Sequence, residues 1–172
     1  MLYMVEMRFT APERLDEWNR WYDEHLGVLL SVPGLSTSQR FRYADGAENL
    51  VAIYTVESDE TLKSEGYTKV AGPRSVGDFK PHIVDWRRNV YDGMARAPVV
   101  APNQLLVLIE GKAGEEAAAG LTVTWLNSVH LDRSPERRGM LVVGAEDAAL
   151  ERLAKIEGIR IFAPMMDQRI EE

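Results

Sequence analysis

The sequence predicts an α+β protein in which a ferredoxin-like β-α-β-β-α-β unit occurs twice in tandem and forms an α/β barrel. Residues 1–95 show strand and helix patterns in this order, and residues 104–170 repeat the order in eroded form. A linker with Pro98 and Pro102 separates the two copies. A four-stranded sheet with helices on one face leaves its other face bare, so we expect the two sheets to cover one another.

The first copy begins with an alternating strand at residues 2–9, followed by a helix from about 12 to 30. Thr10 is the expected cap of this helix, Pro12 lies in its first turn, and the Val32-Pro33-Gly34 segment ends it. The remaining elements follow from turn residues and alternation: a strand at 35–43, a turn at 44–47, a strand at 49–57, a helix from Ser58 to about 71 that Gly72-Pro73 breaks, and a strand at 82–91.

The second copy is expected to have the same elements with a weaker first helix. The predicted elements are a strand at 104–110, an alanine-rich helix at 114–120, strands at 121–131 and 140–144, a helix at 146–157, and a strand at 159–163. The segment 121–131 could also continue the helix before it. This reading divides the chain into a first repeat at 1–97, which carries the expected pocket, and a degenerate second repeat at 103–172.

Composition narrows the classes of function. The 172 residues carry a formal charge of −7, which argues against broad nucleic-acid binding because phosphates require a basic surface. No apolar run approaches the ~20 residues of a membrane span, and the N-terminus does not resemble a signal peptide. The absence of cysteine excludes disulfides and thiol catalysis, and a reducing cytoplasm is the simplest location.

The first predicted helix carries the most informative pattern in the chain. At 100° per residue one stripe collects mainly large apolar and aromatic side chains with a histidine among them: Leu15, Trp18, Trp21, Tyr22, His25, Leu26 and Leu29. A buried imidazole needs a hydrogen-bond partner, so His25 is either a structural histidine bonded to the backbone or part of a ligand pocket. Aromatic walls with few polar groups are typical of small-molecule sites and favour the pocket.

Two further residues are candidates for the same site. Alternation in the strand at 82–91 places His82 on the face of Trp86 and Arg88, so His82 could share a compartment with His25, or could be exposed beside Pro81. Arg40 shares a strand face with Ser38, where it could clamp a carboxylate or simply be solvated. His130 lies on a polar strand side and is expected to be structural or exposed. The chain lacks phosphate-loop, G-x-S-x-G and HExxH motifs, and no metal site is expected.

The pattern Trp18-x-x-Trp21-Tyr22-x-x-His25, followed by Val32-Pro33-Gly34-Leu35 and a strand, resembles the dimeric α/β-barrel superfamily and its EthD-like proteins. The resemblance covers residues 1–95. It implies an activity among cofactor-free monooxygenases, isomerases, dehydratases, decarboxylases and haem proteins, with His25 matching a helix histidine used as an acid/base or ligand contact. The second repeat departs from the single-repeat pattern, so chain fusion could replace the homodimer, and the remaining edges could still dimerise.

From these observations we expect a small cofactor-independent enzyme, a lyase or isomerase rather than a monooxygenase, for a cyclic or aromatic compound. His25 would be the general acid/base because an imidazole titrates near pH 6.5. Tyr22 would orient or donate, Trp18 and Trp21 would form walls, and Arg40 or His82 would hold an anionic group. The alternatives are a non-catalytic ligand-binding or stress-associated module and a haem protein.

Overall fold

The computed structural model describes residues 1–44, 49–72 and 75–171. The first half contains β1 (Leu2–Phe9), α1 (Leu15–Leu30), β2 (Leu35–Tyr43), β3 (Asn49–Val56), α2 (Glu65–Val70) and β4 (Ile83–Asp92). The second half contains β5 (Gln104–Ile109), α3 (Gly111–Ala117), β6 (Thr124–Leu131), β7 (Arg137–Gly144), α4 (Leu150–Leu153), β8 (Ile159–Pro164) and β9 (Arg169–Ile170). Short 3-10 helices lie at Pro12–Arg14, Asp59–Lys63 and Gly77–His82.

Both halves have the ferredoxin-like arrangement that the sequence predicts. The strand order is β2-β3-β1-β4 in the first half and β6-β7-β5-β8 in the second, so each half places its second strand at one edge and its fourth at the other. The pairings β4–β6 and β2–β8 then join the halves at both edges into a closed antiparallel barrel of eight strands. The prediction of an α+β barrel from a tandem repeat is confirmed.

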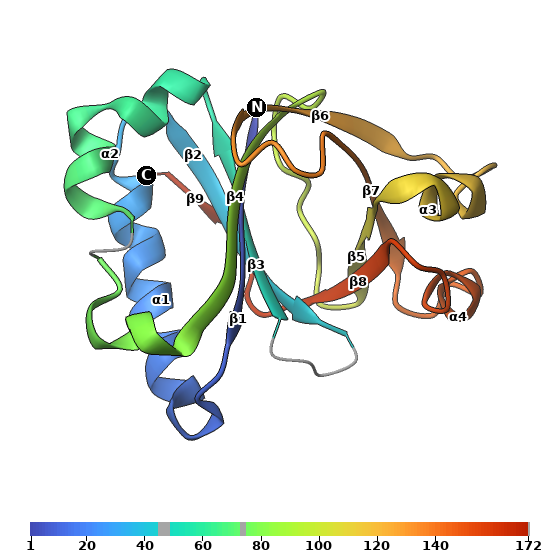
Figure 1. Cartoon of the computed structure of the whole chain (residues 1–172), viewed down its shortest axis with the longest axis horizontal. Coiled ribbons are helices and arrows are strands. Elements are labelled where there is room, and N and C mark those ends of the chain that lie inside the picture. Colours follow the sequence, from blue (N-terminus) through green and yellow to red (C-terminus); the bar gives the residue numbers. More distant parts are fainter. Residues whose placement is uncertain (45–48, 73–74, 172) are drawn as a thin grey trace.

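The helices cover the outside of this barrel at opposite ends of the molecule (Figure 1). Under α1 and α2, the outer faces of β1, β3 and β4 form one apolar core. Under α3 and α4, the outer faces of β5, β7 and β8 form a smaller one. A third core fills the barrel itself with inward-facing residues such as Met4, Ile53, Leu106 and Phe162. The alternation of each strand therefore supplies two cores, one on each side of the wall.

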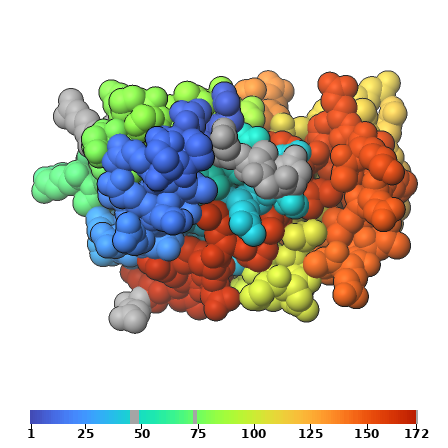
Figure 2. All heavy atoms as spheres, turned by 90° about the horizontal axis from the view of Figure 1, so that it is seen from below, coloured from blue at the N-terminus to red at the C-terminus, as the bar shows by residue number. Residues whose placement is uncertain are grey.

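The linker at residues 93–103 closes one end of the barrel rather than running over the surface. The backbone N–H of Ala97 donates to Thr55 Oγ1, which faces the interior, at 2.9 Å. Gln39 bonds both backbone groups of Val100: its Nε2 donates to the carbonyl at 2.7 Å, and its Oε1 accepts from the N–H at 3.1 Å. The segment after β8, red in Figure 2, lies against α1, where Arg169 donates to the carbonyl of Asp23.

Several boundaries differ from the sequence prediction. Thr10 does not cap the first helix; its hydroxyl donates instead to the carbonyl of His82. The expected helix from Ser58 divides at Ser64, whose Oγ accepts from the N–H of Tyr67 and so begins a new helix. The expected helix at 146–157 is only one turn, Leu150–Leu153. Most of the turn predicted at 44–47 lies outside the described residues, and so does Pro73.

Among the described residues, no helix combines the length and the apolar character needed to cross a membrane.

Candidate active site

Four aromatic rings stack along the inner face of α1. Phe9 of β1 stacks on Trp18 with centroids 5.0 Å apart, Trp18 on Trp21 at 5.0 Å, and Trp21 on His25 at 4.7 Å, and the planes lie within 17° of parallel in each pair. Side chains three or four residues apart on a helix are neighbours. The spacing of Trp18, Trp21 and His25 therefore places their rings next to one another. The imidazole of His25 is therefore the last ring of a continuous column.

A small cavity lies beside this column, between α1, α2 and the outer face of β1, β3 and β4. Its volume is about 30 Å³. The lining is mostly aromatic and apolar with a few polar tips: Tyr3, Val5, Met7, Trp18, Trp21, Tyr22, His25, Leu29, Tyr54, Tyr67, Ala71, Gly72, Ser75, Val76, Trp86 and Arg88. A space of this size holds about one water molecule. The predicted residues Trp18, Trp21, Tyr22 and His25 are all brought together here.

His25 is a neutral base at this cavity. Burial lowers the pKa of its imidazole below the ordinary value of 6.5. Among the described residues no group forms a hydrogen bond or an ion pair with the imidazole, so one ring nitrogen is free to accept a proton.

A guanidinium and two phenols form the polar side of the cavity. The hydroxyls of Tyr3 and Tyr67 are hydrogen-bonded at 2.8 Å. Burial alone would lower the pKa of Arg88, but its interactions with these two phenols outweigh burial and raise it. Within the described part of the chain, no carboxylate pairs with the Arg88 side chain. The site thus holds a partly buried cation that can stabilise an anion.

Two indole N–H groups of the cavity wall also lack acceptors. Nε1 of Trp18 and Nε1 of Trp86 are buried, and neither donates a hydrogen bond to any described residue. Buried donors in native proteins are nearly always satisfied, and those that are not are explained by water, a ligand or strain. At the wall of a cavity with room for about one water molecule, both donors are available to an acceptor that enters the cavity.

Arg40 and His82 lie apart from the cavity lining. The buried guanidinium of Arg40 donates to Asp23 Oδ1 at 3.0 Å and to Asn19 Oδ1 at 2.8 Å, so it fastens α1 to the sheet. It also lies 4.2 Å above the ring of Tyr22. His82 ends a 3-10 helix, with its ring 6.1 Å from that of Phe9.

A β-bulge explains the position of His82. The β1–β4 register shifts between Glu6 and Arg8, and Asp85 has φ of 54°. The shift changes the parity of the strand, so Ile83 rather than His82 packs into the core that contains Trp86. His130, expected to be structural or exposed, is partly exposed, with Nδ1 3.9 Å from Asp59 Oδ2.

Arg88 is the site residue to which sequence reasoning assigned no role. Its alternation with Trp86 and Val90 placed it on the correct face, but nothing in the chain pattern distinguishes a cation over a cavity from one in solvent. The contact that defines it, with Tyr3 and Tyr67, joins β4 to two distant elements.

In its closed form the cavity is too small for haem. Ligand pockets of drug-sized molecules measure roughly 300–1,000 Å³, an order of magnitude above the space found here. The described residues also contain no group of three histidine, aspartate or glutamate side chains arranged to hold a metal ion.

No protein-family model and no curated protein matches the sequence. Solved structures do match over nearly the whole chain. An anthrone oxidase-like protein has a TM-score of 0.59 at 11% identity, with 99% of this chain and 93% of that chain covered. A candidate monooxygenase from Lactobacillus acidophilus has a TM-score of 0.53 at 10% identity, with 99% and 96% covered.

A candidate chlorite dismutase likewise has a TM-score of 0.53 at 12% identity, with 96% of this chain and 95% of that chain covered. At such identities the likeness establishes a shared fold, the α+β barrel, over both halves of the molecule. The activities of proteins with this fold differ, so function has to be argued from the site.

Proposed function

We propose that this protein is a cofactor-independent enzyme that catalyses histidine-assisted proton transfer on a small cyclic or aromatic compound. The observation that carries the proposal is the pairing of two groups in one aromatic cavity: the unpartnered, neutral imidazole of His25 and the carboxylate-free guanidinium of Arg88. A base and an anion stabiliser beside the same substrate are what removal of a proton next to a carbonyl requires.

In the proposed reaction, His25 accepts a proton from a substrate carbon adjacent to a carbonyl group. The electron pair of the broken C–H bond moves onto the carbonyl oxygen, and Arg88 with the hydroxyl of Tyr67 stabilises the resulting oxyanion. Return of the proton from His25 to a different carbon gives isomerisation; departure of a neighbouring hydroxyl, protonated by the imidazolium, gives dehydration. Trp18 and Trp21 hold the substrate ring, and Tyr22 orients His25 edge-on at a centroid distance of 6.3 Å.

Substrate entry requires one wall of the cavity to move. Just outside lies an open groove of about 480 Å³ that shares Tyr67, Ala71, Gly72 and Arg88 with the cavity lining. The residues common to both spaces, Tyr67 of the six-residue helix α2, Ala71, Gly72 and Arg88, therefore form the wall between them. We expect a substrate to approach through this groove and to displace that layer as it reaches His25.

Proton abstraction can be tested without knowing the overall reaction. The protein is incubated in D₂O with a panel of enolisable aromatic ketones and lactones, and deuterium incorporation at the acidic carbon is followed by NMR. Oxygen uptake is recorded in parallel, because a carbanion can also react with O₂ and one structural neighbour is anthrone oxidase-like. We expect at least one compound to exchange faster than in buffer.

Variants then assign the exchange to the site. His25→Gln should slow it by about 10²-fold or more, the usual contribution of a general base. His82→Gln is the matched control, because this histidine lines neither the cavity nor the groove that leads to it. Equal exchange by the His25 variant would exclude His25 as the base.

The non-catalytic alternative makes a different prediction. If the cavity only packs shut, no compound exchanges, and His25→Phe raises the melting temperature because a well-packed ring replaces a partly desolvated imidazole. Haem addition tests the haem alternative: a Soret band would support it, and its absence would count against it.

A further inference from the structure

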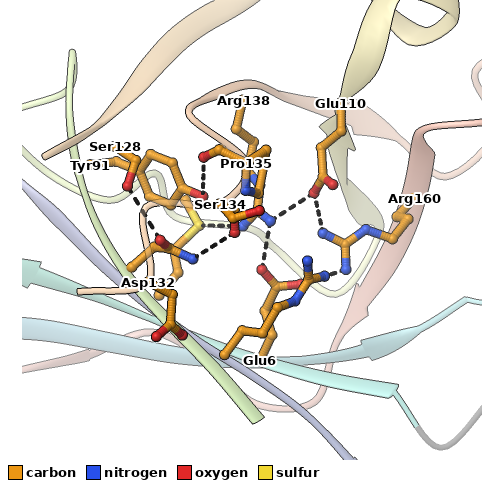
Figure 3. Close-up of polar contacts among 12 residues, drawn as sticks. Glu6, Tyr91, Glu110, Ser128, Asp132, Ser134, Pro135, Arg138 and Arg160 are labelled. Carbon is orange, nitrogen blue, oxygen red and sulfur yellow. Dashed lines mark hydrogen bonds and ion pairs between the residues drawn. The ribbon is translucent and has the colours of Figure 1, made fainter. Parts of the chain in front are cut away.

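A closed group of four charges lies inside the barrel at the end opposite the linker (Figure 3). Arg138 Nη2 contacts Glu6 Oε1 at 2.6 Å and Glu110 Oε1 at 2.7 Å. Arg160 contacts the same two carboxylates, Glu6 through Nη1 and Glu110 through Nη2. Each carboxylate is thus shared by both guanidinium groups, and the charges of these four side chains sum to zero. We refer to them as the charge quartet.

Arg87 adds a fifth charge that the quartet does not neutralise. Its Nη2 lies 3.7 Å from Glu6 Oε2, too far for a hydrogen bond, and both guanidinium groups of the quartet lie closer to that carboxylate. The described residues form no hydrogen bond with the Arg87 side chain. The nearby carboxylate of Asp85 is engaged by Arg8 at 3.1 Å. Among the described residues, Arg87 is therefore a cation whose nearest carboxylate is already paired more closely with two other guanidinium groups.

This charge faces an open hollow of about 390 Å³. Its lining combines the charged groups with an amide and three apolar side chains: Glu6, Met7, Asn49, Leu50, Asp85, Arg87, Arg160 and Phe162. The volume is within the range of small-molecule sites, unlike that of the aromatic cavity. A guanidinium fork with no hydrogen bond to a described residue, next to a largely apolar rim, matches a small ligand with one carboxylate.

We propose that this hollow is a second ligand site, which binds a small organic monocarboxylate through Arg87. The one negative charge of the ligand would pair with the Arg87 guanidinium. The Asn49 amide can donate to the same carboxylate, and the hydrophobic body of the ligand would lie beside Leu50 at the rim of the hollow. The carboxylates of the quartet do not repel the ligand strongly, because each is already paired with two guanidinium groups.

The neighbouring residues Arg87 and Arg88 then serve two separate compartments. Successive side chains of a strand point to opposite faces, so Arg87 enters the barrel hollow while Arg88 lines the aromatic cavity outside the wall. This second site does not depend on the reaction proposed for His25. The two arginines also provide matched variants for separating the two sites.

The test uses benzoate as the probe and its neutral analogue benzamide as the comparison, followed by two-dimensional ¹H–¹⁵N NMR of the full chain. Backbone amides of Asn49, Arg160 and Phe162 report on the hollow, and the indole N–H signals of Trp18 and Trp86 report on the aromatic cavity. We expect saturable shifts at the first group with benzoate and at least tenfold weaker binding of benzamide there.

Arg87→Gln should weaken benzoate binding at the hollow at least tenfold, whereas Arg88→Gln should leave it unchanged. Arg87 is 43% exposed, so its replacement should not unfold the chain, and a thermal melt verifies this. No shift at the hollow with benzoate, equal binding of benzamide, or equal binding by the Arg87 variant would each overturn the proposal. Benzoate-induced shifts at the indole N–H signals of Trp18 and Trp86, without shifts at the hollow, would also overturn the proposal, because they would place the ligand in the aromatic cavity.

Discussion

Removing the buried carboxylate of Glu6 should destabilise the protein strongly and alter its response to acid. Burial alone would raise the pKa of Glu6, but Arg138 and Arg160 outweigh burial and lower it from 4.5 to about 2. A difference of about 2.5 in pKa corresponds to about 3 kcal/mol, at 1.36 kcal/mol per unit. The side chain is only 6% exposed, so solvent screens little of this interaction. We therefore expect Glu6→Gln to lower the free energy of unfolding by about 3 kcal/mol or more, since Arg138 loses a partner and has no access to water.

The pH dependence follows from the direction of the shift. Because the pKa of Glu6 is lower in the folded state, the unfolded chain binds more protons between pH 4.5 and about 2. The stabilisation is fully present above pH 4.5 and is lost as the pH falls towards 2. Urea unfolding from pH 2 to 7 should show this loss in the wild type and a shallower dependence in Glu6→Gln.

Glu17→Gln is the control, because Glu17 pairs with Arg14 on the surface and should contribute little. An unchanged unfolding midpoint and acid dependence in Glu6→Gln would refute this reasoning about the charge quartet.

Three further changes test other parts of the structure. Trp18→Ala removes a fully buried ring from the middle of the aromatic column and should lower the free energy of unfolding by about 3–5 kcal/mol in urea titrations; a loss below 1 kcal/mol would contradict the tight packing. The NMR signal of the imidazole C2 proton of His25 should titrate with a midpoint below pH 6.5. Because the unfolded chain then binds a proton at a higher pH than the folded chain, the contribution of His25 to stability should fall as the pH is lowered. A midpoint above 6.5 would indicate an unrecognised anionic partner. Gly158→Ala should lower the melting temperature more than Gly111→Ala. Both glycines have positive φ, but of the two only Gly158 would place the new Cβ against a carbonyl oxygen, that of Glu110, at 2.0 Å. Equal melting temperatures would show that backbone strain alone matters.

The sequence predicted the fold where local patterns determine local structure. The strands predicted at 2–9 and 35–43 have the same bounds as β1 and β2, because their alternation separates two cores on opposite sides of the barrel wall. The stripe on α1 placed Trp18, Trp21, Tyr22 and His25 together because helical spacing fixes their mutual positions. These features depend on residues no more than a few positions apart.

The features that the sequence did not predict depend on contacts between distant residues. The alternation that grouped His82 with Trp86 assumed a regular strand, and the bulge at Asp85 appears only when β4 pairs with β1. The charge quartet joins Glu6 to Arg138 and Arg160 from the second half of the chain. No spacing rule relates such positions.

The two edges of β2 lead to a consequence for synthesis in the cell. One edge pairs with β3 nearby in the chain, but the other waits for β8 and β9, through pairs such as Arg42 with Ala163 and Ser38 with Arg169. At a translation rate of about 5–20 residues per second, roughly 6–24 s separate the emergence of β2 and β8 from the ribosome. During that interval the nascent first half exposes an unpaired strand edge to other chains. Aggregation during translation therefore competes with folding until β8 and β9 pair with β2 and close the barrel.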